Sequence, residues 1–147
     1  MTRPFTPSAI VIVVALLFGN WDARAQKMSS ARLNYILQCQ GCHLADGSGT
    51  PKKVPALKQD VGRFLQVEGG REFLIQVPGT SQSALTDAEV ADVLNWILEN
   101  FSPDQLGDDF VPYTASEITR HRKPLVNVSS VRAGLVAQMS IDRKSVV

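Results

Sequence analysis

The feature that most constrains this chain is the pentapeptide Cys39-Gln40-Gly41-Cys42-His43, which has the pattern C-x-x-C-H. It contains the only two cysteines in the sequence. Two thiols three positions apart on one helical turn can each add to a vinyl group of a porphyrin, and the adjoining imidazole can then bind the iron. The pattern predicts one covalent haem, tethered by Cys39 and Cys42 and ligated axially by His43. Such a cofactor is a large apolar plate, so the core would form around it as well as around side chains.

A C-x-x-C redox pair or a small disulfide loop is the alternative interpretation of the same residues. A thioredoxin-like pair requires a βαβ setting, and the sequence does not indicate one. We therefore favour haem attachment over thiol redox chemistry.

The N-terminus has the pattern of a secretory signal peptide. Arg3 gives a positive start, an unbroken apolar run covers Ala9 to Phe18, and Ala23-Arg24-Ala25 has the A-x-A form of a cleavage site. The run is only about ten residues, shorter than the roughly 20 needed to span a bilayer. We expect residues 1–25 to be removed after Ala25, which leaves a mature chain that begins at Gln26 and has no transmembrane segment.

Helix signals dominate the mature chain, which at about 122 residues is the size of one small domain. Ser29 or Ser30 can cap a first helix that runs into Cys39 and carries Leu33, Ile36 and Leu37 toward one side. Thr86 and Glu89 form a capping box for a helix that ends at Phe101. Its apolar positions have helical spacing: Val90, Val93, Leu94, Ile97, Leu98 and Phe101. Short amphipathic segments at 61–67 and 71–77 are separated by Gly69-Gly70, so little room is left for strands.

These residues together resemble the class I c-type cytochromes, over roughly 29–101. The resemblance is carried by the C-x-x-C-H motif at the end of a helix, by Asp46-Gly47-Ser48-Gly49, by Pro55-Ala56-Leu57 and by a last amphipathic helix that carries Trp96. It implies an all-α, cytochrome c-like domain in which the first and last helices pack across each other. It also implies that Pro55, twelve residues after His43, offers its carbonyl to the imidazole. Attachment of such a haem outside the cytoplasm implies a periplasmic protein.

The sequence departs from that family where a methionine ligand is usual, shortly before the final helix. The corresponding position has Val77-Pro78-Gly79, and valine cannot ligate iron. The two methionines of the mature chain, Met28 and Met139, lie outside the expected loop. His121 is therefore the candidate sixth ligand, although a surface histidine in a basic cluster is the simpler interpretation. An open or water-bound iron, His43 with His121, and His43 with Met139 all remain possible.

Residues 102–147 form a C-terminal extension beyond the haem domain, which we assign to 26–101. Ala115 to Arg122 is a short helix candidate, Lys123-Pro124 breaks it, and Asn127 or Ser129 can cap a second helix that reaches Met139. The extension is either a strap over the domain's own surface or a docking segment for a partner.

Charge is balanced overall, with a formal net charge of +1, but its distribution is uneven. Seven basic and three acidic residues lie between Gln26 and Arg71, whereas the stretch from Ala84 to Thr119 has eight acidic residues and no basic ones. Such asymmetry can orient a charged partner. No basic tract is dense enough to indicate nucleic acid. Arg63 and Arg71 are candidates for pairing with the haem propionates, although an exposed surface position is the simpler interpretation of each.

The predicted function is periplasmic transfer of single electrons to and from redox partner proteins, such as a dehydrogenase or a terminal acceptor. The alternatives are a five-coordinate haem protein that binds a diatomic gas and a haem subunit of a larger dehydrogenase complex. No acid and base pair or nucleophile constellation is recognisable, so an enzyme is not expected, and peroxidase-like chemistry would require an open iron.

Overall fold

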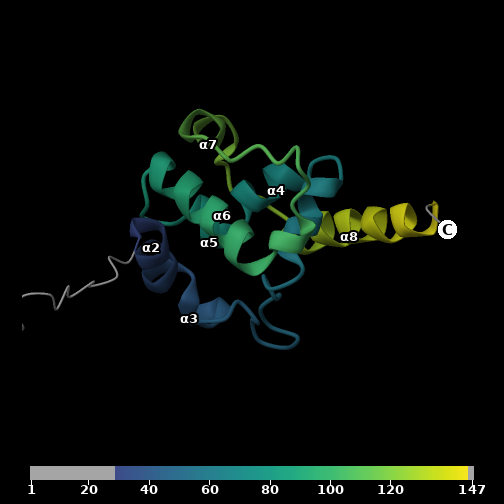
Figure 1. Cartoon of the computed structure of the whole chain (residues 1–147), viewed down its shortest axis with the longest axis horizontal. Helices are drawn as coiled ribbons and strands as arrows, with labels where there is room; N and C mark the ends of the chain where they lie inside the picture. Colours follow the sequence, from purple (N-terminus) through teal and green to yellow (C-terminus); the bar gives the residue numbers. More distant parts are fainter. Residues whose placement is uncertain (1–28, 146–147) are drawn as a thin grey trace, which may run out of the picture.

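The computed structural model describes residues 29–145, which form helices joined by loops (Figure 1). The helices in chain order are α2 (Ser30–Gln38), α3 (Gln40–His43), η1 (Val61–Gln66), α4 (Gly70–Gln76), α5 (Pro78–Ser81), α6 (Asp87–Phe101), η2 (Pro103–Gln105), α7 (Ala115–His121) and α8 (Val128–Ser145). The strand pairing in this part of the chain is limited to one bridge between Thr50 and Val54. The prediction of an all-α fold is confirmed. None of the described helices is both long enough and apolar enough to cross a membrane. The predicted signal peptide lies outside the described residues.

The helix α6 is the central element, and it begins and ends where its sequence pattern predicts. Thr86 is the N-cap, its hydroxyl accepting from the Glu89 backbone N–H at 3.3 Å, while the Glu89 carboxylate accepts from the Thr86 N–H at 2.8 Å. This reciprocal pair satisfies backbone donors that the first helical turn would otherwise leave unpaired. The apolar face is buried through Val90, Ala91, Val93, Leu94, Ile97 and Leu98.

The helix α2 packs on α6 through one aromatic residue. Tyr35 is 1% exposed, and its ring centroid lies 5.1 Å from that of Trp96 and 5.2 Å from that of Phe101. Of the three apolar residues expected on the packed side, Ile36 is half-buried, whereas Leu33 and Leu37 remain 42% and 66% exposed. The aromatic side chains of α6 thus select a different face of α2 from the one that leucine spacing indicates.

The middle of the chain, from η1 to α5, follows the predicted breaks closely. Gly69 has a φ of +77°, a conformation that glycine adopts without steric cost, and it forms the N-cap of α4. Phe64 of η1 and Phe73 of α4 stack with ring centroids 5.1 Å apart. Pro78 occupies the first turn of the short helix α5, where a missing N–H costs nothing.

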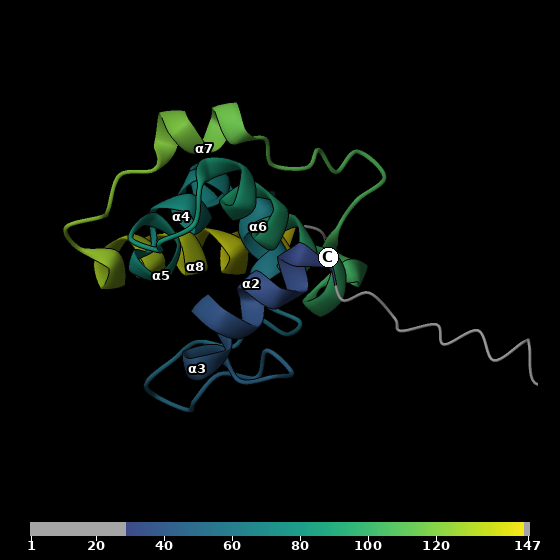
Figure 2. The ribbon, with the colours of Figure 1, turned by 90° about the vertical axis from the view of Figure 1, so that its left-hand side faces the viewer.

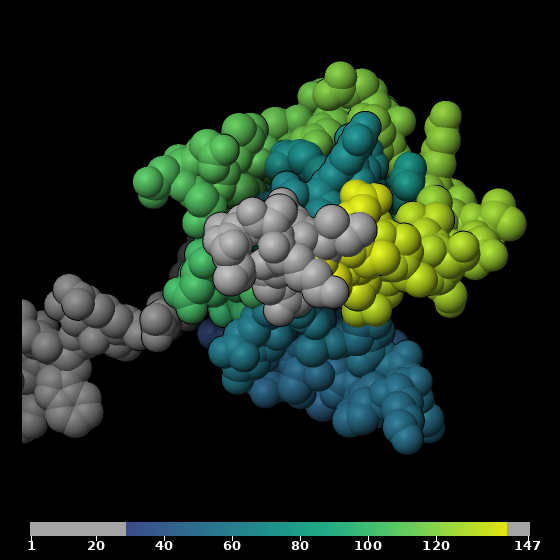
Figure 3. All heavy atoms as spheres, turned by 90° about the vertical axis from the view of Figure 1, so that its right-hand side faces the viewer, coloured from purple at the N-terminus to yellow at the C-terminus, as the bar shows by residue number. Residues whose placement is uncertain are grey.

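The described part of the C-terminal extension belongs to the same hydrophobic core as the rest of the chain. Tyr113, Ile118, Leu135 and Met139 are all buried in the cluster that includes the apolar face of α6. The helix α7 packs on α6, and α8 packs on η1 and α4. Figure 3 shows α8 in yellow at the surface, between the blue segment that carries the attachment motif and the green segment of the extension. The α7 and α8 helices therefore cover the protein's own surface.

Candidate haem site

The two cysteines and the histidine of the motif lie on consecutive helical turns at the junction of α2 and α3. The N–H of Cys39 donates to the Tyr35 carbonyl at 2.9 Å and closes α2. The carbonyl of Cys39 then accepts from the N–H groups of Cys42 and His43, at 3.2 and 3.0 Å, and opens α3. This geometry brings the two thiols and the imidazole together within one short helical segment.

Both cysteines are free thiols, and their surroundings differ. Cys39 is half-buried, and burial raises the pKa of its thiol to about 11, with a smaller contribution from Cys42. Cys42 is exposed. Reactive redox cysteines have a lowered pKa that favours the thiolate. The raised pKa of Cys39 is the opposite of that arrangement.

His43 is held by the carbonyl group of Pro55. The His43 Nδ1 lies 3.1 Å from the Pro55 oxygen, and since a carbonyl can only accept, Nδ1 is the nitrogen that carries the hydrogen. The Nε2 atom is then left with a free lone pair, as an iron ligand requires. Burial lowers the pKa of His43, and the bond to Pro55 opposes that shift only in part. The imidazole is therefore biased toward the neutral form that binds metals.

The loop between His43 and Pro55 turns back on itself, and glycine makes this possible. The N–H of Gly49 donates to the His43 carbonyl at 3.1 Å, and Thr50 and Val54 exchange backbone hydrogen bonds at 2.9 and 2.8 Å. Gly49 has a φ of +67°, and a Cβ atom there would lie 2.4 Å from the Val54 carbonyl oxygen. No other residue type fits this position without moving the segment that ends at Pro55.

Tyr35 is a residue of the site that the sequence pattern alone did not identify. Its hydroxyl donates to the Leu44 carbonyl at 2.5 Å and so ties the residue after His43 back to α2. Burial, followed by the nearby Cys39 and Asp46, raises the pKa of Tyr35 to about 12. Its position four residues before Cys39, on the same side of the helix, is the signal that could have identified it.

The candidate sixth ligands lie elsewhere in the molecule. His121 is the last residue of α7, and Figures 1 and 2 place α7 and α3 at opposite ends of the molecule. Met139 is 7% exposed within the core, on α8. Val77 is the half-buried C-cap of α4. The structure brings Pro55 to His43, but it does not bring His121 there.

The two arginines considered for the propionates are already engaged. Arg71 forms a two-pronged ion pair with Glu117, with its Nη2 2.9 Å from Oε2, and its Nη1 donates to the Val111 carbonyl at 2.8 Å. Arg63 pairs with Asp60 at 3.2 Å. Arg71 thus connects α4 to the extension.

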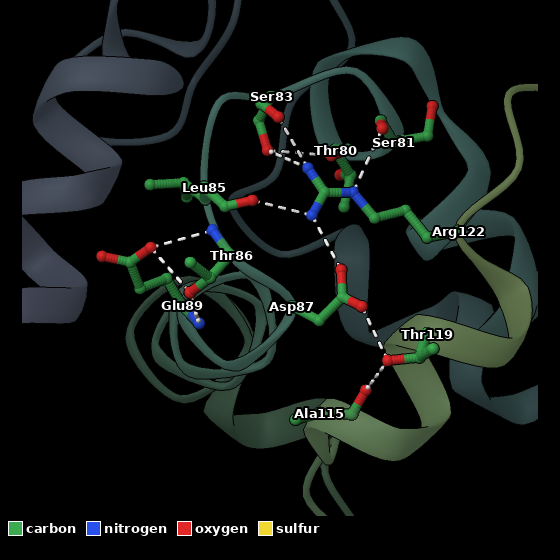
Figure 4. Close-up of polar contacts among 10 residues, drawn as sticks. All are labelled: Thr80, Ser81, Ser83, Leu85, Thr86, Asp87, Glu89, Ala115, Thr119 and Arg122. Atoms are coloured by element: carbon green, nitrogen blue, oxygen red, sulfur yellow. Dashed lines mark hydrogen bonds and ion pairs between the residues drawn. The ribbon is translucent and has the colours of Figure 1, made fainter.

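Arg122 connects the extension to the segment that precedes α6, a role that no sequence pattern indicated (Figure 4). Its guanidinium donates to the carbonyl groups of Ser81, Leu85 and Ser83, at 3.1, 2.7 and 2.6 Å, and to the Asp87 carboxylate at 2.9 Å. Asp87 also accepts from the Thr119 hydroxyl at 2.6 Å. One side chain therefore binds acceptors along the whole segment that connects α5 to α6.

Two free thiols on adjoining turns and an imidazole held by the Pro55 carbonyl form the arrangement that covalent haem attachment requires. No protein-family model matches the chain. A cytochrome c-552 of Thermus thermophilus is 33% identical over 114 aligned positions, which cover 65% of this chain and 87% of the relative. A second cytochrome c-552 of the same species has the same identity and is covered over 77% of its length. The chain belongs to the c-type cytochromes.

Proposed function

We propose that this chain is a periplasmic carrier of single electrons that holds one haem through Cys39 and Cys42, with His43 as an axial ligand. The observation that carries the proposal is the contact of His43 with Pro55 at 3.1 Å, next to two free cysteines. A haem iron supplies the one-electron redox change when bound. The partners would be redox proteins, such as a dehydrogenase that supplies electrons or an acceptor that removes them.

The protein's own contribution is to orient the ligand. The Pro55 carbonyl fixes the rotation of the His43 ring and increases the basicity of its free nitrogen, as hydrogen-bond partners of metal ligands commonly do. Tyr35 holds the chain on both sides of the motif, through its buried ring and through the Leu44 carbonyl. These contacts limit the movement of the ligand when the charge of the site changes.

We further propose that the iron lacks a methionine ligand, which distinguishes the protein from the class I members it resembles. The segment from Val77 to Thr86 contains no methionine, and Met139 belongs to the hydrophobic core. Because methionine ligation raises the reduction potential, its absence would give a carrier of lower potential. His121 as the sixth ligand would require α7 to leave α6.

A haem protein that binds a diatomic gas is the second candidate. It is favoured by the distance in the fold between His43 and α7, since an iron without a sixth protein ligand is open to carbon monoxide or nitric oxide. Slow exchange with redox partners and tight binding of carbon monoxide would be expected of such a protein.

Spectra of the matured protein would separate these possibilities. The chain should be expressed with haem-attachment machinery, and ferric and ferrous spectra recorded with and without carbon monoxide, including the far-red band of iron–methionine ligation. A low-spin spectrum that is insensitive to carbon monoxide supports the electron carrier, and a high-spin spectrum that shifts readily supports gas binding. A Cys39→Ser/Cys42→Ser variant that still held haem covalently would contradict the attachment proposal.

The location is tested separately. Cell fractionation should find the haem protein in the periplasm, and N-terminal analysis should find a chain that begins at Gln26. A cytoplasmic haem protein that retained residues 1–25 would contradict this part of the proposal.

A further inference from the structure

The exposed face of α6 carries carboxylates that no cation neutralises in the described part of the chain. Asp92 and Glu99 are exposed, and each lies within one helical turn of Trp96, so the three residues share one face of the helix. Neither carboxylate takes part in an ion pair there. This face therefore has a negative field that salt bridges do not cancel.

The segment that follows α6 returns along this helix and is acidic as well. The Asn95 side chain binds Tyr113, with Nδ2 donating to the Tyr113 carbonyl at 3.0 Å and Oδ1 accepting from the Tyr113 N–H at 2.7 Å. Asp108 and Asp109, which precede Tyr113, are exposed. Residues 84–119, which include α6 and this segment, have eight acidic side chains and no basic one. The extension therefore brings no positive charge from this segment to the exposed face of α6.

Trp96 connects this face to the attachment motif through Tyr35. The indole is half-buried, and its ring centroid lies 5.1 Å from that of the buried Tyr35 ring. The Tyr35 carbonyl accepts the backbone hydrogen bond of Cys39 at 2.9 Å. Electrons tunnel more readily through bonded atoms and contacting π systems than across solvent. One hydrogen bond and one ring contact thus link Cys39 to a side chain that reaches the surface.

We propose that the face of α6 formed by Asp92, Trp96 and Glu99 is a docking surface for a redox protein with a basic surface, and that Tyr35 and Trp96 bridge the electron between that partner and the cofactor. The inference rests on the proposed electron-transfer function. One electron passes from the bound haem to the one-electron centre of the partner, so the haem is oxidised as the partner is reduced. Neither ring changes its redox state, because each acts only as a bridge for tunnelling.

The chemistry of this face selects a basic protein. An indole ring stacks favourably with lysine and arginine side chains, and tryptophan is enriched at the centres of protein interfaces. A carboxylate rim increases the rate of encounter with a positively charged partner, whereas an anionic membrane would repel it. A second copy of the chain also has basic residues, such as Arg32 and Lys53. Identical carriers have the same reduction potential, however, so contact between two copies would give no net electron transfer.

A gold electrode coated with an ammonium-terminated monolayer can stand in for the basic partner. The matured holoprotein should adsorb at low salt, as measured by surface plasmon resonance, and should exchange electrons with the electrode. Glu99→Lys should weaken adsorption by about fivefold, because an attractive charge becomes repulsive. Glu68→Lys is the matched control, since Glu68 is an exposed glutamate between η1 and α4 that takes part in no ion pair within the described residues.

Variants of Trp96 test the role of the two rings. Trp96→Leu should adsorb as the wild type does but exchange electrons with the electrode severalfold more slowly, because the ring contact with Tyr35 is lost. Trp96→Phe keeps an aromatic ring and should recover most of the rate. Both variants should keep the wild-type redox titration with small soluble mediators. The comparison of Glu99→Lys with Glu68→Lys changes only exposed residues, so it decides the docking surface whatever the stability of the Trp96 variants.

The proposal is supported if only Glu99→Lys loses adsorption and if Trp96→Leu slows electron exchange without changing adsorption. Equal effects of Glu99→Lys and Glu68→Lys overturn the docking surface, and a wild-type rate in Trp96→Leu overturns the role of the rings. Dimerisation of the holoprotein at low salt that Glu99→Lys abolishes would assign the face to a second copy and would also overturn the proposal. Failure of every variant and of the wild type to change redox state with mediators would instead contradict the electron-transfer function, while adsorption would still decide the docking surface.

Discussion

Arg122, the C-cap of α7, places its Nη1 atom 2.9 Å from Oδ1 of Asp87, the first residue of α6. The two residues are 35 positions apart, and the same guanidinium also donates to the carbonyl groups of Ser81, the last residue of α5, and of Ser83 and Leu85. The backbone connection into the central helix is thus held by a residue of the C-terminal extension. The extension should therefore be required for stability, whatever its relation to a partner.

Replacing Arg122 with glutamine should destabilise the holoprotein by about 2–4 kcal/mol, because several partly buried acceptors lose a charged donor at once. The Arg122 side chain is only 15% exposed, so water replaces those bonds poorly. Urea denaturation measures the change. Arg120→Gln is the control: Arg120 is exposed and should have an effect within about 0.5 kcal/mol. Equal effects of the two variants would show that the network adds no stability.

Part of the loss of folding stability in acid should come from protonation of Glu117. The hydrogen bond from Arg71 lowers the pKa of Glu117 below 4.5, so the unfolded chain binds this proton more tightly than the folded chain. The stabilisation is fully present above pH 4.5 and is lost as the pH falls through the lower, folded-state pKa. The difference in unfolding free energy between the wild type and Glu117→Gln should therefore narrow below pH 4.5. Parallel curves for the two proteins down to acid unfolding would argue against this linkage.

The hydroxyl group and the ring of Tyr35 should make separate contributions to the free energy of unfolding. Tyr35→Phe keeps the contacts with Trp96 and Phe101 but leaves the Leu44 carbonyl without its donor, at a cost of about 1–2 kcal/mol. Tyr35→Ala also removes the ring and should cost about 3–5 kcal/mol. Thermal unfolding of both holoproteins tests the order. A Tyr35→Phe protein as stable as the wild type would mean that the 2.5 Å contact is energetically neutral.

Gly49→Ala should destabilise the loop that carries Pro55. The residue is in the left-handed region, which costs a non-glycine residue about 1–2 kcal/mol, and the added Cβ would also meet the Val54 carbonyl. Lower stability and a lower yield of matured haem protein are expected. Gly134→Ala is the matched control, because a Cβ there meets nothing within 4 Å in α8, and helix propensity predicts a gain of up to about 1 kcal/mol. A Gly49→Ala protein with wild-type yield and stability would show that the loop can rearrange.

The predictions that rest on local sequence patterns agree with the structure. The capping box of Thr86 and Glu89, the Ser29 cap of α2 and the break at Pro124 all involve residues within one turn of each other. The contact between His43 and Pro55, twelve residues apart, was implied by the resemblance to the class I c-type cytochromes. In the caps and the break the interacting groups are within one turn of each other, so the sequence limits the possible arrangements.

The structural roles of Tyr35, Arg71 and Arg122 were not predictable in this way. Their partners are supplied by α6, by α7 and by the segment before α6, and many pairings across such distances are compatible with the same helical spacing. Leu33 and Leu37 illustrate the same limit, since apolar spacing on α2 indicated a buried side that the aromatic residues of α6 do not use.

The helical fold class, the ends of the main helices and the grouping of two thiols with an imidazole are already specified along the chain. Covalent spacing and backbone hydrogen bonding define these features over a few residues. Folding in three dimensions selects the buried face of α2, joins Arg71 to the extension and Arg122 to the start of α6, and places α7 at the opposite end of the molecule from α3. Those outcomes depend on long-range packing, in which the burial of apolar surface on α6 determines which distant residues become neighbours.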